Sequence, residues 1–429
     1  MLAANFADAH PPLSPAQALV EADRCLFCYD APCIEACPTG IDVPGFIRSI
    51  GTGNLRGAAV AILRENILGG TCGRVCPTEV LCEQACVRNA DADRPVRIGL
   101  LQRHATDWLM EREPTPFTRG APVPGRVAVV GAGPAGLSCA HRLALLGHEV
   151  VVHEAKPKPG GLNEYGIAAY KMADDFAQRE VAFVLSLGGI TLRHGCRLGQ
   201  DVTLAELRAD YDAVFLACGQ AGVRALALEQ EAMPGVLDAV AFIAGLRQAA
   251  DKAAVPVGQR VVVIGGGNTA VDAAVQAARL GAEDVTIAYR RGPDTMSATA
   301  KEQAWARAHG VRILHWAQPV ALLPGVDGTV AGVACRHAQR GEAFTLSADM
   351  VLKAVGQVLE TGPAPDVPVT AARIAVDAEG RTSLPRVYAG GDCTAGPDLT
   401  VQAVQDGKVA AEAIHRDLMT NAAEAAWPT

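Results

Sequence analysis

Two segments of this chain repeat one local pattern, in which a short apolar strand runs directly into a glycine-rich turn and then into a helix. The first strand is Arg126–Val130, and the second begins at Arg260. Glycines at such a turn let the backbone approach a pyrophosphate, and the following helix directs its positive end at the phosphate charge. Each pattern opens a βαβ unit. The chain is therefore predicted to contain two Rossmann-like dinucleotide-binding domains with parallel sheets.

The first glycine loop combines several features of a dinucleotide site. Residues 137–146 have the periodicity of a helix, and the next strand ends in Glu154, where an acidic side chain would bind the hydroxyl groups of a ribose. An ordinary strand–turn–helix joint is the alternative, but it would not explain an acidic residue at the end of the next strand. The predicted contacts in the loop are Gly131, Gly133, Pro134, Ala135 and Gly136.

A third glycine sequence lies near the C-terminal end of the chain. A strand that ends in Gly390, Gly391 and Asp392 precedes a predicted helix over residues 401–418. This arrangement resembles the second FAD signature of flavoproteins with two dinucleotide-binding domains, in which the aspartate holds the ribityl or phosphate region. Taken alone, Asp392 would fit a simple turn equally well. Together with the first loop, it predicts a FAD-binding domain in two parts.

The second glycine loop has the form GxGxxA, which is a normal variant of the dinucleotide fingerprint. Its strand partner, residues 284–288, is followed by Arg290 and Arg291, close to where Glu154 lies in the first unit. An arginine pair at this position favours the 2′-phosphate of NADP, whereas an acid would favour NAD. A solvated basic turn is the alternative. The predicted contacts in the loop are Gly265, Gly267, Asn268, Thr269 and Ala270.

The cysteines mark a separate N-terminal domain, since eight of the thirteen lie between Cys25 and Cys86. Close spacing and Cys-Pro steps are typical of four-iron clusters. Zinc is the main alternative, but it has no redox chemistry to share with a flavin. Eight thiolates would suffice for two [4Fe-4S] clusters. They are Cys25, Cys28, Cys33, Cys37, Cys72, Cys76, Cys82 and Cys86.

These patterns divide the chain into an α/β protein with an N-terminal α-helical domain. Helical periodicity appears at residues 57–66 and 98–111, and a proline-rich linker follows. We predict a helical iron–sulfur domain at 1–120 and a first FAD-binding part at 121–225. The inserted NAD(P)-binding domain is placed at 226–350, and the second FAD-binding part at 351–429.

Bulk composition narrows the class of protein. The net charge is −8, which disfavours nucleic acid and anionic membranes as partners. The N-terminus has no basic segment followed by an apolar core, and the apolar runs are strand-sized, so we expect a cytoplasmic protein. In that compartment many cysteines indicate cluster ligation rather than disulfides.

Almost the whole chain resembles the glutamate synthase small-subunit family, and within it the dihydropyrimidine dehydrogenases. The resemblance is carried by the segments around Cys25–Cys37, around Cys72–Cys86 and around Gln102. It implies one cluster on Cys25, Cys28, Cys33 and Cys86. It implies a second cluster on Cys37, Cys76, Cys82 and Gln102. Judged from the residues alone, Cys72 would be the eighth ligand and Gln102 a helix-surface amide.

The resemblance also implies more of the FAD site and an activity. Gly161 and Leu162 would lie in a FAD-side loop, and Thr400 and Gln402 would contact the flavin through their backbone. The implied reaction passes electrons from NAD(P)H through FAD and two [4Fe-4S] clusters to a separate FMN- and cluster-bearing subunit. That partner would reduce uracil or thymine, which makes the chain part of a hetero-oligomer.

Three other functions are compatible with parts of the sequence. They are the small subunit of glutamate synthase, a ferredoxin:NADP oxidoreductase, and a non-catalytic cluster protein that senses redox state. Gln102 and the sequence Asp30–Cys33 argue against glutamate synthase, and two complete nucleotide loops argue against a sensor. No catalytic acid–base residue is predicted, because the flavin supplies the chemistry of hydride transfer. No Cys-x2-Cys pair lies beside the flavin loops, which disfavours a disulfide mechanism.

Overall fold

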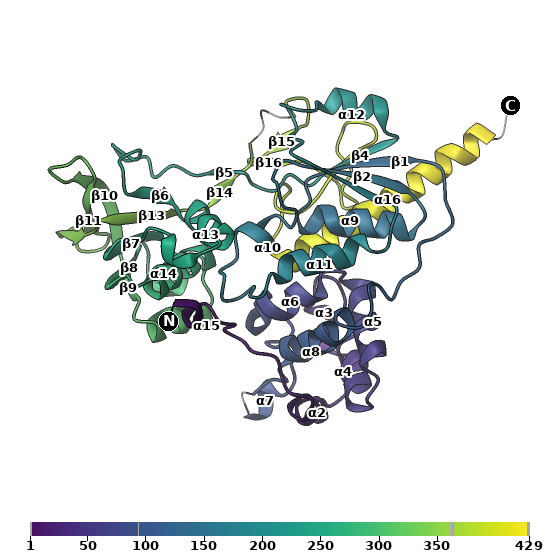
Figure 1. Cartoon of the computed structure of the whole chain (residues 1–429), viewed down its shortest axis with the longest axis horizontal. Coiled ribbons are helices and arrows are strands. Elements are labelled where there is room, and N and C mark those ends of the chain that lie inside the picture. The colour runs from purple at the N-terminus through teal and green to yellow at the C-terminus, as the bar shows by residue number, and fades with distance from the viewer. Residues whose placement is uncertain (1, 93, 361, 363, 427–429) are drawn as a thin grey trace. The chain divides into compact units, whose positions relative to one another are not determined.

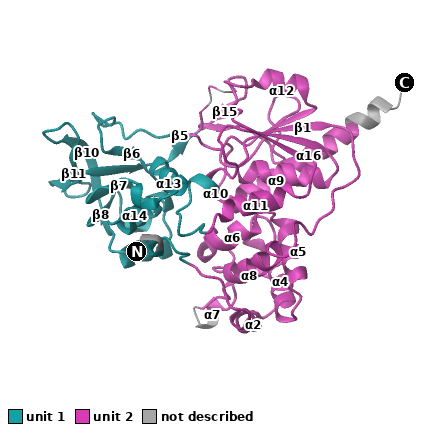
Figure 2. Cartoon of the chain, in the orientation of Figure 1, with its two compact units in different colours: residues 1–9, 164–173, 222–358 teal, residues 10–163, 174–221, 359–429 magenta. Residues whose placement is uncertain are grey.

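The computed structural model describes residues 2–92, 94–360, 362 and 364–426, which form two compact units (Figure 2). Unit 1 comprises residues 1–9, 164–173 and 222–358, and unit 2 comprises residues 10–163, 174–221 and 359–429. Unit 2 therefore contains the cysteine-rich segment and the first glycine loop, while unit 1 contains the second loop.

Figure 1 labels the helices and strands along the chain. The α-helices are α1 (Leu2–Asn5), α2 (Pro15–Asp23), α3 (Pro32–Glu35), α4 (Val43–Gly51), α5 (Leu55–Glu65), α6 (Gly69–Val75), α7 (Asn89–Ala92), α8 (Ile98–Met110), α9 (Pro134–Leu145), α10 (Leu162–Tyr165), α11 (Phe176–Leu185), α12 (Leu204–Asp210), α13 (Ala239–Gln248), α14 (Asn268–Leu280), α15 (Ala300–Ala308) and α16 (Thr400–Ala426). Short 3₁₀ helices lie at η1 (Thr78–Val80), η2 (Lys252–Ala254) and η3 (Pro293–Thr295). The strands are β1 (Arg126–Val130), β2 (Glu149–Glu154), β3 (Ile190–His194), β4 (Ala213–Leu216), β5 (Gly222–Val223), β6 (Val236–Asp238), β7 (Arg260–Gly265), β8 (Asp284–Tyr289), β9 (Arg312–His315), β10 (Ala317–Pro324), β11 (Val330–His337), β12 (Ala343–Ser347), β13 (Met350–Ala354), β14 (Gln357–Val358), β15 (Val369–Thr370), β16 (Arg373–Ile374) and β17 (Val387–Ala389).

A five-stranded parallel sheet organises the nucleotide-binding part of unit 2. Its strand order is β17-β4-β1-β2-β3, with Val127 beside Val150 on one side and beside Ala213 on the other. Alternate residues of β1 enter two different cores: Val127 and Val129 pack with α9 and α16, and Ala128 and Val130 pack with α12. Strands covered on both faces have the continuous apolar sequence that predicted them.

The helices before this sheet form the cysteine-rich part of unit 2. Their starts are fixed by short polar side chains, because Asp42 accepts a hydrogen bond from the Gly45 N–H and Asn54 accepts one from the Gly57 N–H. Large side chains of α4, α5 and α8, such as Ile47, share one core with the α9 side of the sheet. The cysteines lie mainly in the short connections between these helices.

Unit 1 is built on a second five-stranded parallel sheet, in the order β6-β13-β7-β8-β9. Val261 and Val263 of β7 pack with α13 and α14 on one face. Val262 and Ile264 pack on the other face with the antiparallel sheet β10-β11-β12. No helix among the described residues is long and apolar enough to cross a membrane.

The predicted fold class is confirmed, and the helices expected at residues 57–66, 98–111 and 401–418 correspond to α5, α8 and α16. The sequence reading did not foresee the antiparallel sheet β10-β11-β12. It also did not foresee that residues 164–173 belong to unit 1, although they lie within the first predicted FAD-binding part. The four predicted domain boundaries stay a proposal.

Candidate functional site

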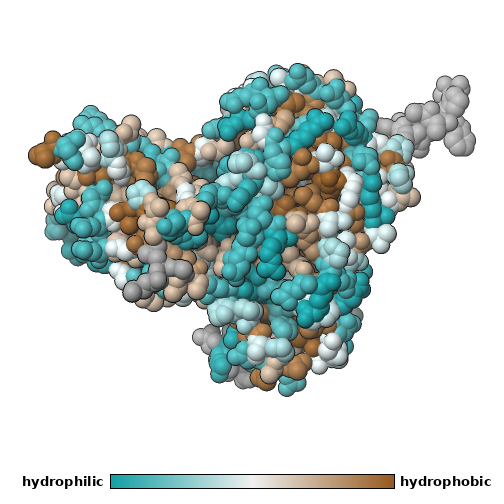
Figure 3. All heavy atoms as spheres, in the orientation of Figure 1, coloured by the Kyte–Doolittle hydropathy of each residue, from teal (hydrophilic) through white to brown (hydrophobic). Residues whose placement is uncertain are grey.

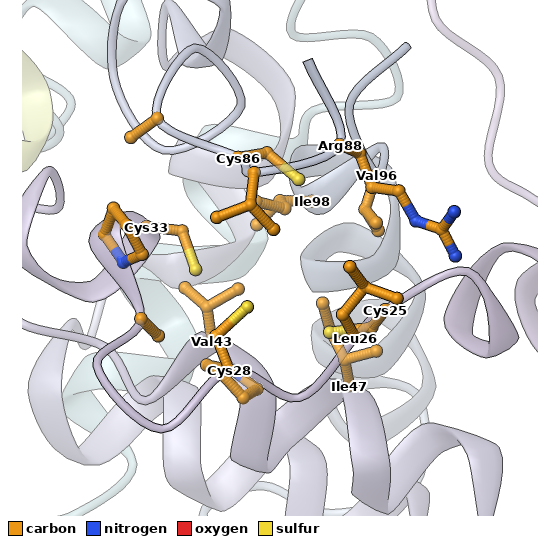
Figure 4. Close-up of a pocket in the computed structure, with 15 residues that line it drawn as sticks. Cys25, Leu26, Cys28, Cys33, Val43, Ile47, Cys86, Arg88, Val96 and Ile98 are labelled. Carbon is orange, nitrogen blue, oxygen red and sulfur yellow. The ribbon is translucent and has the colours of Figure 1, made fainter. Parts of the chain in front are cut away.

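Four of the predicted cluster ligands line one pocket, although they come from cysteine runs that are far apart in the sequence. Cys25 and Cys28 lie in the loop after α2, Cys33 lies on α3, and Cys86 belongs to the second run. In Figure 4 the sulfur atoms of Cys28, Cys33 and Cys86 face a shared space, with Cys25 at its edge. The space measures about 370 Å³, including the part open to solvent.

The lining of this pocket is otherwise mostly apolar, with Val43, Ile47 and Ile98 among the side chains and Arg88 at the rim. Burial, together with the neighbouring thiols of Cys25 and Cys86, raises the pKa of the Cys33 thiol to about 11. Four adjacent thiolates in such a setting would repel one another. The donor set therefore fits a bound cationic centre that stabilises all four thiolates together.

The spacing of the cysteines also bears on zinc. A tetrahedral zinc site needs thiolates almost in contact, because each Zn–S bond is about 2.3 Å long. Among the described residues, no three His, Cys, Asp or Glu side chains are arranged to hold one metal ion. Four thiols that line one pocket are the donor set of a [4Fe-4S] cluster.

The second predicted set consists of Cys37, Cys76 and Cys82. Burial raises the pKa of the Cys76 thiol well above its ordinary value, and the thiols of Cys72, Cys82 and Cys37 add to the effect. Burial also raises the pKa of Cys82, as do Glu83 and Cys37. These mutual effects show that the three predicted ligands lie close together, and that they are more enclosed than the first set.

Cys72 lies beside this second set, and Gln102 contacts α6, the helix that carries Cys72. The Gln102 side chain is buried, and its amide Nε2 donates to the Gly69 carbonyl at 2.7 Å, which leaves Oε1 as the atom that can ligate iron. Cys72 is buried on α6, and burial raises the pKa of its thiol, an effect that the nearby Asn66 side chain partly offsets. The structure places Cys72 near Cys37 and Cys76 and Gln102 against the start of α6, and the eighth ligand stays a prediction.

The first glycine loop is closed by the protein at two positions and open at one. A Cβ on Gly131 would lie 2.4 Å from the Ala217 carbonyl oxygen, and a Cβ on Gly136 would lie 1.9 Å from the Gly131 carbonyl oxygen. A Cβ on Gly133 would meet nothing nearer than the Gly161 Cα, at 3.8 Å. Gly133 therefore leaves space for a ligand, and Pro134, Ala135 and Gly136 form the first turn of α9 behind it.

Glu154 ends β2 and holds its carboxylate against this loop. Its Oε2 accepts from the Ala132 N–H at 2.7 Å, and its Oε1 accepts from the Lys156 N–H at 2.7 Å. Each carboxylate oxygen keeps a second lone pair, so the buried side chain can still accept from ribose hydroxyl groups. The position fits the adenosine end of a dinucleotide.

The third glycine sequence lies against the first loop. A Cβ on Gly391 would lie 2.8 Å from the Ala135 Cβ, and a Cβ on Gly161 would lie 2.7 Å from the Gly133 Cα. Leu162 follows as the first residue of α10. Burial, together with the nearby Asp398 carboxylate, raises the pKa of Asp392 to about 6. The structure therefore brings three distant segments of unit 2 to one site.

Thr400 and Gln402 lie in the first turn of α16, where backbone N–H groups have no partner within the helix. Their side chains are engaged by the protein. The Thr400 hydroxyl lies 3.0 Å from Asn163 Oδ1, and Gln402 donates to Asp406 Oδ1 at 2.8 Å. Contact with a flavin would thus use the backbone. Asp406, which also accepts from the Gly391 N–H at 3.0 Å, was not foreseen because no spacing in the sequence distinguishes it.

The second glycine loop in unit 1 follows the same plan. A Cβ on Gly265 would lie 2.2 Å from the Ala354 carbonyl oxygen, whereas a Cβ on Gly267 would meet nothing nearer than Ser297 Oγ, at 3.5 Å. Asn268, Thr269 and Ala270 begin α14, with the Ala270 methyl fully buried. This loop is therefore also open at Gly267, the second glycine of the GxGxxA fingerprint.

Arg290 and Arg291 are exposed directly after β8. The Tyr289 ring before them packs under the loop, since a Cβ on Gly266 would lie 2.4 Å from that ring. The Arg291 guanidinium lies 5.7 Å from the centre of the same ring. A basic pair beside an open glycine loop can bind an additional phosphate group of a nucleotide.

Two family models match the chain. Residues 2–114 match the model described as dihydropyrimidine dehydrogenase domain II with a 4Fe-4S cluster, and residues 125–407 match pyridine nucleotide-disulphide oxidoreductase. The fold and site thus define an oxidoreductase that joins a 4Fe-4S domain to pyridine-nucleotide domains. Its cofactors are those that the sequence predicted: FAD, [4Fe-4S] clusters and a nicotinamide nucleotide.

Curated relatives narrow the family. The NAD-dependent dihydropyrimidine dehydrogenase subunit PreT of Salmonella typhimurium is 36% identical over 95% of this chain and 96% of its own length, and PreT of Escherichia coli K12 is similar to the same extent. The NADPH glutamate synthase small chain of E. coli K12 is 33% identical over 96% of this chain and 93% of its own length. The chain belongs to the family of PreT subunits of dihydropyrimidine dehydrogenase, as the sequence resemblance predicted.

Solved structures share the fold of the nucleotide-binding parts. Thioredoxin reductase of T. acidophilum has a TM-score of 0.56 at 23% identity, covering 69% of this chain and 99% of that protein. FprA of Mycobacterium tuberculosis in complex with NADPH has a TM-score of 0.60 at 21% identity, covering 71% of this chain and 88% of that protein.

Proposed function

We propose that this chain is the electron-input subunit of a two-part cytoplasmic dihydropyrimidine dehydrogenase. It oxidises NAD(P)H and passes electrons to a separate FMN- and iron–sulfur-containing subunit that reduces uracil or thymine to the dihydropyrimidine. The observation that carries this proposal is the convergence of Cys25, Cys28, Cys33 and Cys86 on one pocket, within the compact unit that also contains the first glycine loop. Two redox centres in one unit form a route for electrons.

The nucleotide loops bind and orient the reactants. Gly265, Gly267 and the first turn of α14 would hold the pyrophosphate of NAD(P)H, with Arg290 and Arg291 at its adenosine end. Gly131, Gly133 and the first turn of α9 would hold FAD, with Glu154 on its ribose. When bound, FAD supplies the chemistry that accepts a hydride and releases electrons singly. No proton transfer from a protein side chain is required.

The remaining site residues complete these two roles. The flavin end of the FAD site would be formed by Gly161, Leu162, Gly391, Asp392, Thr400 and Gln402. The first cluster would be held by Cys25, Cys28, Cys33 and Cys86. The second cluster would be held by Cys37, Cys76, Cys82 and Gln102.

An exposed apolar collar surrounds the first cysteine set and supports an electron exit there. Leu26, Tyr29 and Val87 each directly follow a cysteine of this set, and their exposed fractions are 57%, 99% and 38%. Figure 3 shows hydrophobic residues at the surface near α2 and α4, among polar ones. Contiguous exposed apolar residues mark interaction surfaces. We assign the collar to the contact with the catalytic subunit.

The test is to purify the chain anaerobically with and without a co-expressed FMN-bearing partner. The chain alone should reduce artificial acceptors with NAD(P)H but should not reduce uracil, and the complex should reduce uracil. Replacement of Tyr29 by Ser should weaken the complex and leave the artificial-acceptor activity intact. Uracil reduction by the pure single chain would refute the division of labour.

The related glutamate synthase small chain gives the main alternative outcome. If the partner recovered from native cells under anaerobic conditions were a large amidotransferase-bearing subunit, the electron-input chemistry would stand and the pyrimidine assignment would fall. Recovery of only a small ferredoxin would point to a ferredoxin:NADP oxidoreductase.

A further inference from the structure

A buried carboxylate on the flavin side of unit 2 reaches the helix beside the second cysteine set. Glu180 lies on α11 with 2% of its surface exposed. Its Oε1 accepts from the Thr71 N–H at 2.9 Å, and its Oε2 accepts from the Thr71 hydroxyl. Thr71 is fully buried on α6. Both oxygens of Glu180 therefore accept hydrogen bonds from Thr71, which lies on a seven-residue helix.

The place of this contact on α6 gives it a specific role. The residue before the helix, Leu68, makes no side-chain capping bond, so the first N–H groups of α6 need acceptors from elsewhere. Thr71 is the third residue of α6, which is the position whose N–H an N-cap side chain normally satisfies. Glu180 thus acts as the N-terminal cap of α6, supplied by another helix.

The sequence allows this close approach. A Cβ on Gly70 would lie 2.5 Å from the Phe176 ring and 2.8 Å from Glu180 Oε1, so α11 and α6 can meet only at a glycine. The nearest cation is Arg74, whose guanidinium lies 3.4 Å from the centre of the Phe176 ring and is paired with Asp107 at 2.8 Å. Burial raises the pKa of Glu180 to about 7.

The capped helix carries the parts that decide the eighth cluster ligand. The Gly69 carbonyl at its start receives the Gln102 Nε2 donor and so orients the Gln102 amide. Cys72 lies one residue after Thr71, and Cys76 directly follows the helix. A shift of α6 would release Gln102 and move the Cys72 thiol relative to Cys37 and Cys82, which lie outside the helix.

Resting on the proposed function, we propose that Glu180 is a positioning residue for the second cluster: it caps α6 in the register in which the Gln102 oxygen, rather than the Cys72 thiol, completes the ligand set. In this role the carboxylate is not itself a cluster ligand, since both of its oxygens accept from Thr71. It acts through Thr71, and through Thr71 it links α11 of the flavin-binding part to the ligand geometry.

The experiment compares Glu180→Ala, Glu180→Gln and Cys72→Ala in the anaerobically purified full chain, using iron and sulfide content, EPR spectra and redox titration. Glu180→Gln should match the unsubstituted protein, because its amide can accept from the Thr71 N–H and donate to the hydroxyl. Cys72→Ala should keep both clusters and both spectra.

Glu180→Ala should keep its iron but change the spectrum of one cluster only. Replacement of a neutral amide by an anionic thiolate disfavours reduction, so the ratio of reduced to oxidised cluster should fall at least tenfold, equivalent to about 59 mV for one electron. Adding Cys72→Ala to Glu180→Ala should remove that new spectrum. If Glu180→Ala does not fold, Thr71→Val, which removes only the hydroxyl bond, should give a smaller change in the same cluster.

Two results would overturn the inference. One is a Glu180→Ala protein that contains all its iron and sulfide and has unchanged EPR spectra and redox potentials. Where Glu180→Ala does not fold, the equivalent result is a Thr71→Val protein with unchanged EPR spectra and redox potentials. The other is loss of the second cluster in Cys72→Ala, which would make Cys72 the ligand. Absence of iron and sulfide from the unsubstituted protein is a different result, because it would refute the proposed function itself.

Discussion

The two glycine loops share one backbone plan but differ in how tightly the protein closes around them. In both, the first glycine has a positive φ and lies against a carbonyl of the neighbouring strand's loop, and the second glycine is open. The third position differs: Gly136 in the first loop has no room for a Cβ, whereas Ala270 in the second carries a buried methyl. The two loops thus share one sequence fingerprint but differ in whether a Cβ fits at its third position.

The largest effect should come from substitution at this third position. The Cβ of Gly136→Ala would lie 1.9 Å from the Gly131 carbonyl oxygen, so the turn must deform, at a cost of about 3 kcal/mol. We expect loss of most of the bound FAD and a lower unfolding temperature. Flavin absorbance and thermal unfolding of the purified protein measure both.

The matched change in the other loop is Ala270→Gly. It removes a methyl at the start of α14 and should cost about 1 kcal/mol, with FAD content unchanged. If Gly136→Ala kept its full flavin content, or if both variants lost equal stability, the difference between the loops would not hold.

A smaller effect is expected from Glu154→Ala. The substitution leaves the N–H groups of Ala132 and Lys156 without their acceptor and removes the proposed ribose contact. The cost of about 2 kcal/mol corresponds to roughly thirtyfold weaker FAD binding. Titration of the flavin-free protein with FAD measures it. Glu154→Gln keeps one acceptor and should lose less, and equal affinity in all three proteins would exclude Glu154 from the site.

The two units also differ in the helix that follows each loop. Five residues after Gly136, unit 2 has His141, and five residues after Ala270, unit 1 has Val275. Both side chains are buried. Burial, together with the charge of Arg142, lowers the pKa of His141 to about 3. The unfolded chain binds a proton there below about pH 6.5 and the folded chain does not, so stability falls as the pH drops from 6.5 toward 3.

At pH 5 this cost is about 2 kcal/mol. His141→Val makes the first unit resemble the second and should remove that part of the acid sensitivity. Urea unfolding at pH 7.5 and pH 5, followed by tryptophan fluorescence under anaerobic conditions, gives the difference for each protein. The same pH difference in both proteins would contradict a neutral buried imidazole.

Local sequence was sufficient to predict the glycine loops because each lies within one strand–turn–helix unit, where spacing dictates geometry. The antiparallel sheet β10-β11-β12 was not predicted, because its strands alternate weakly and it is defined by packing on Val262 and Ile264. The place of residues 164–173 in unit 1 was not foreseen for a similar reason. Their attachment to unit 1 depends on buried partners distant in the sequence, such as Asp272 for Lys171 at 2.7 Å.

The cysteine pockets show the same limit. The spacing of the cysteines indicated clusters, but only three-dimensional proximity brings Cys86 to Cys25, Cys28 and Cys33. The sequence alone favoured Cys72 over Gln102, since nothing in a single helix shows that an amide will be buried and held by a carbonyl of another helix. The cap of α6 by Glu180 has no local pattern at all.

The smallest effect concerns the side chains at the ends of two corresponding strands. Glu154 ends β2 in unit 2, and Arg290 and Arg291 directly follow β8 in unit 1. Arg290 and Arg291 are exposed, so solvent screens their interaction with a 2′-phosphate, and the pair should contribute only about 1 kcal/mol. Changing both to Ala should lower kcat/KM for NADPH about tenfold or less and leave the value for NADH unchanged. The control is Arg312→Ala, which removes an arginine paired with Asp284 at the start of the same strand. It should affect neither nucleotide. The opposite result would be an unsubstituted protein that already prefers NADH, with the same preference in the double variant. The arginines would then form a solvated turn. The two loops would differ in the room that they leave for a Cβ, but not in recognition of a 2′-phosphate.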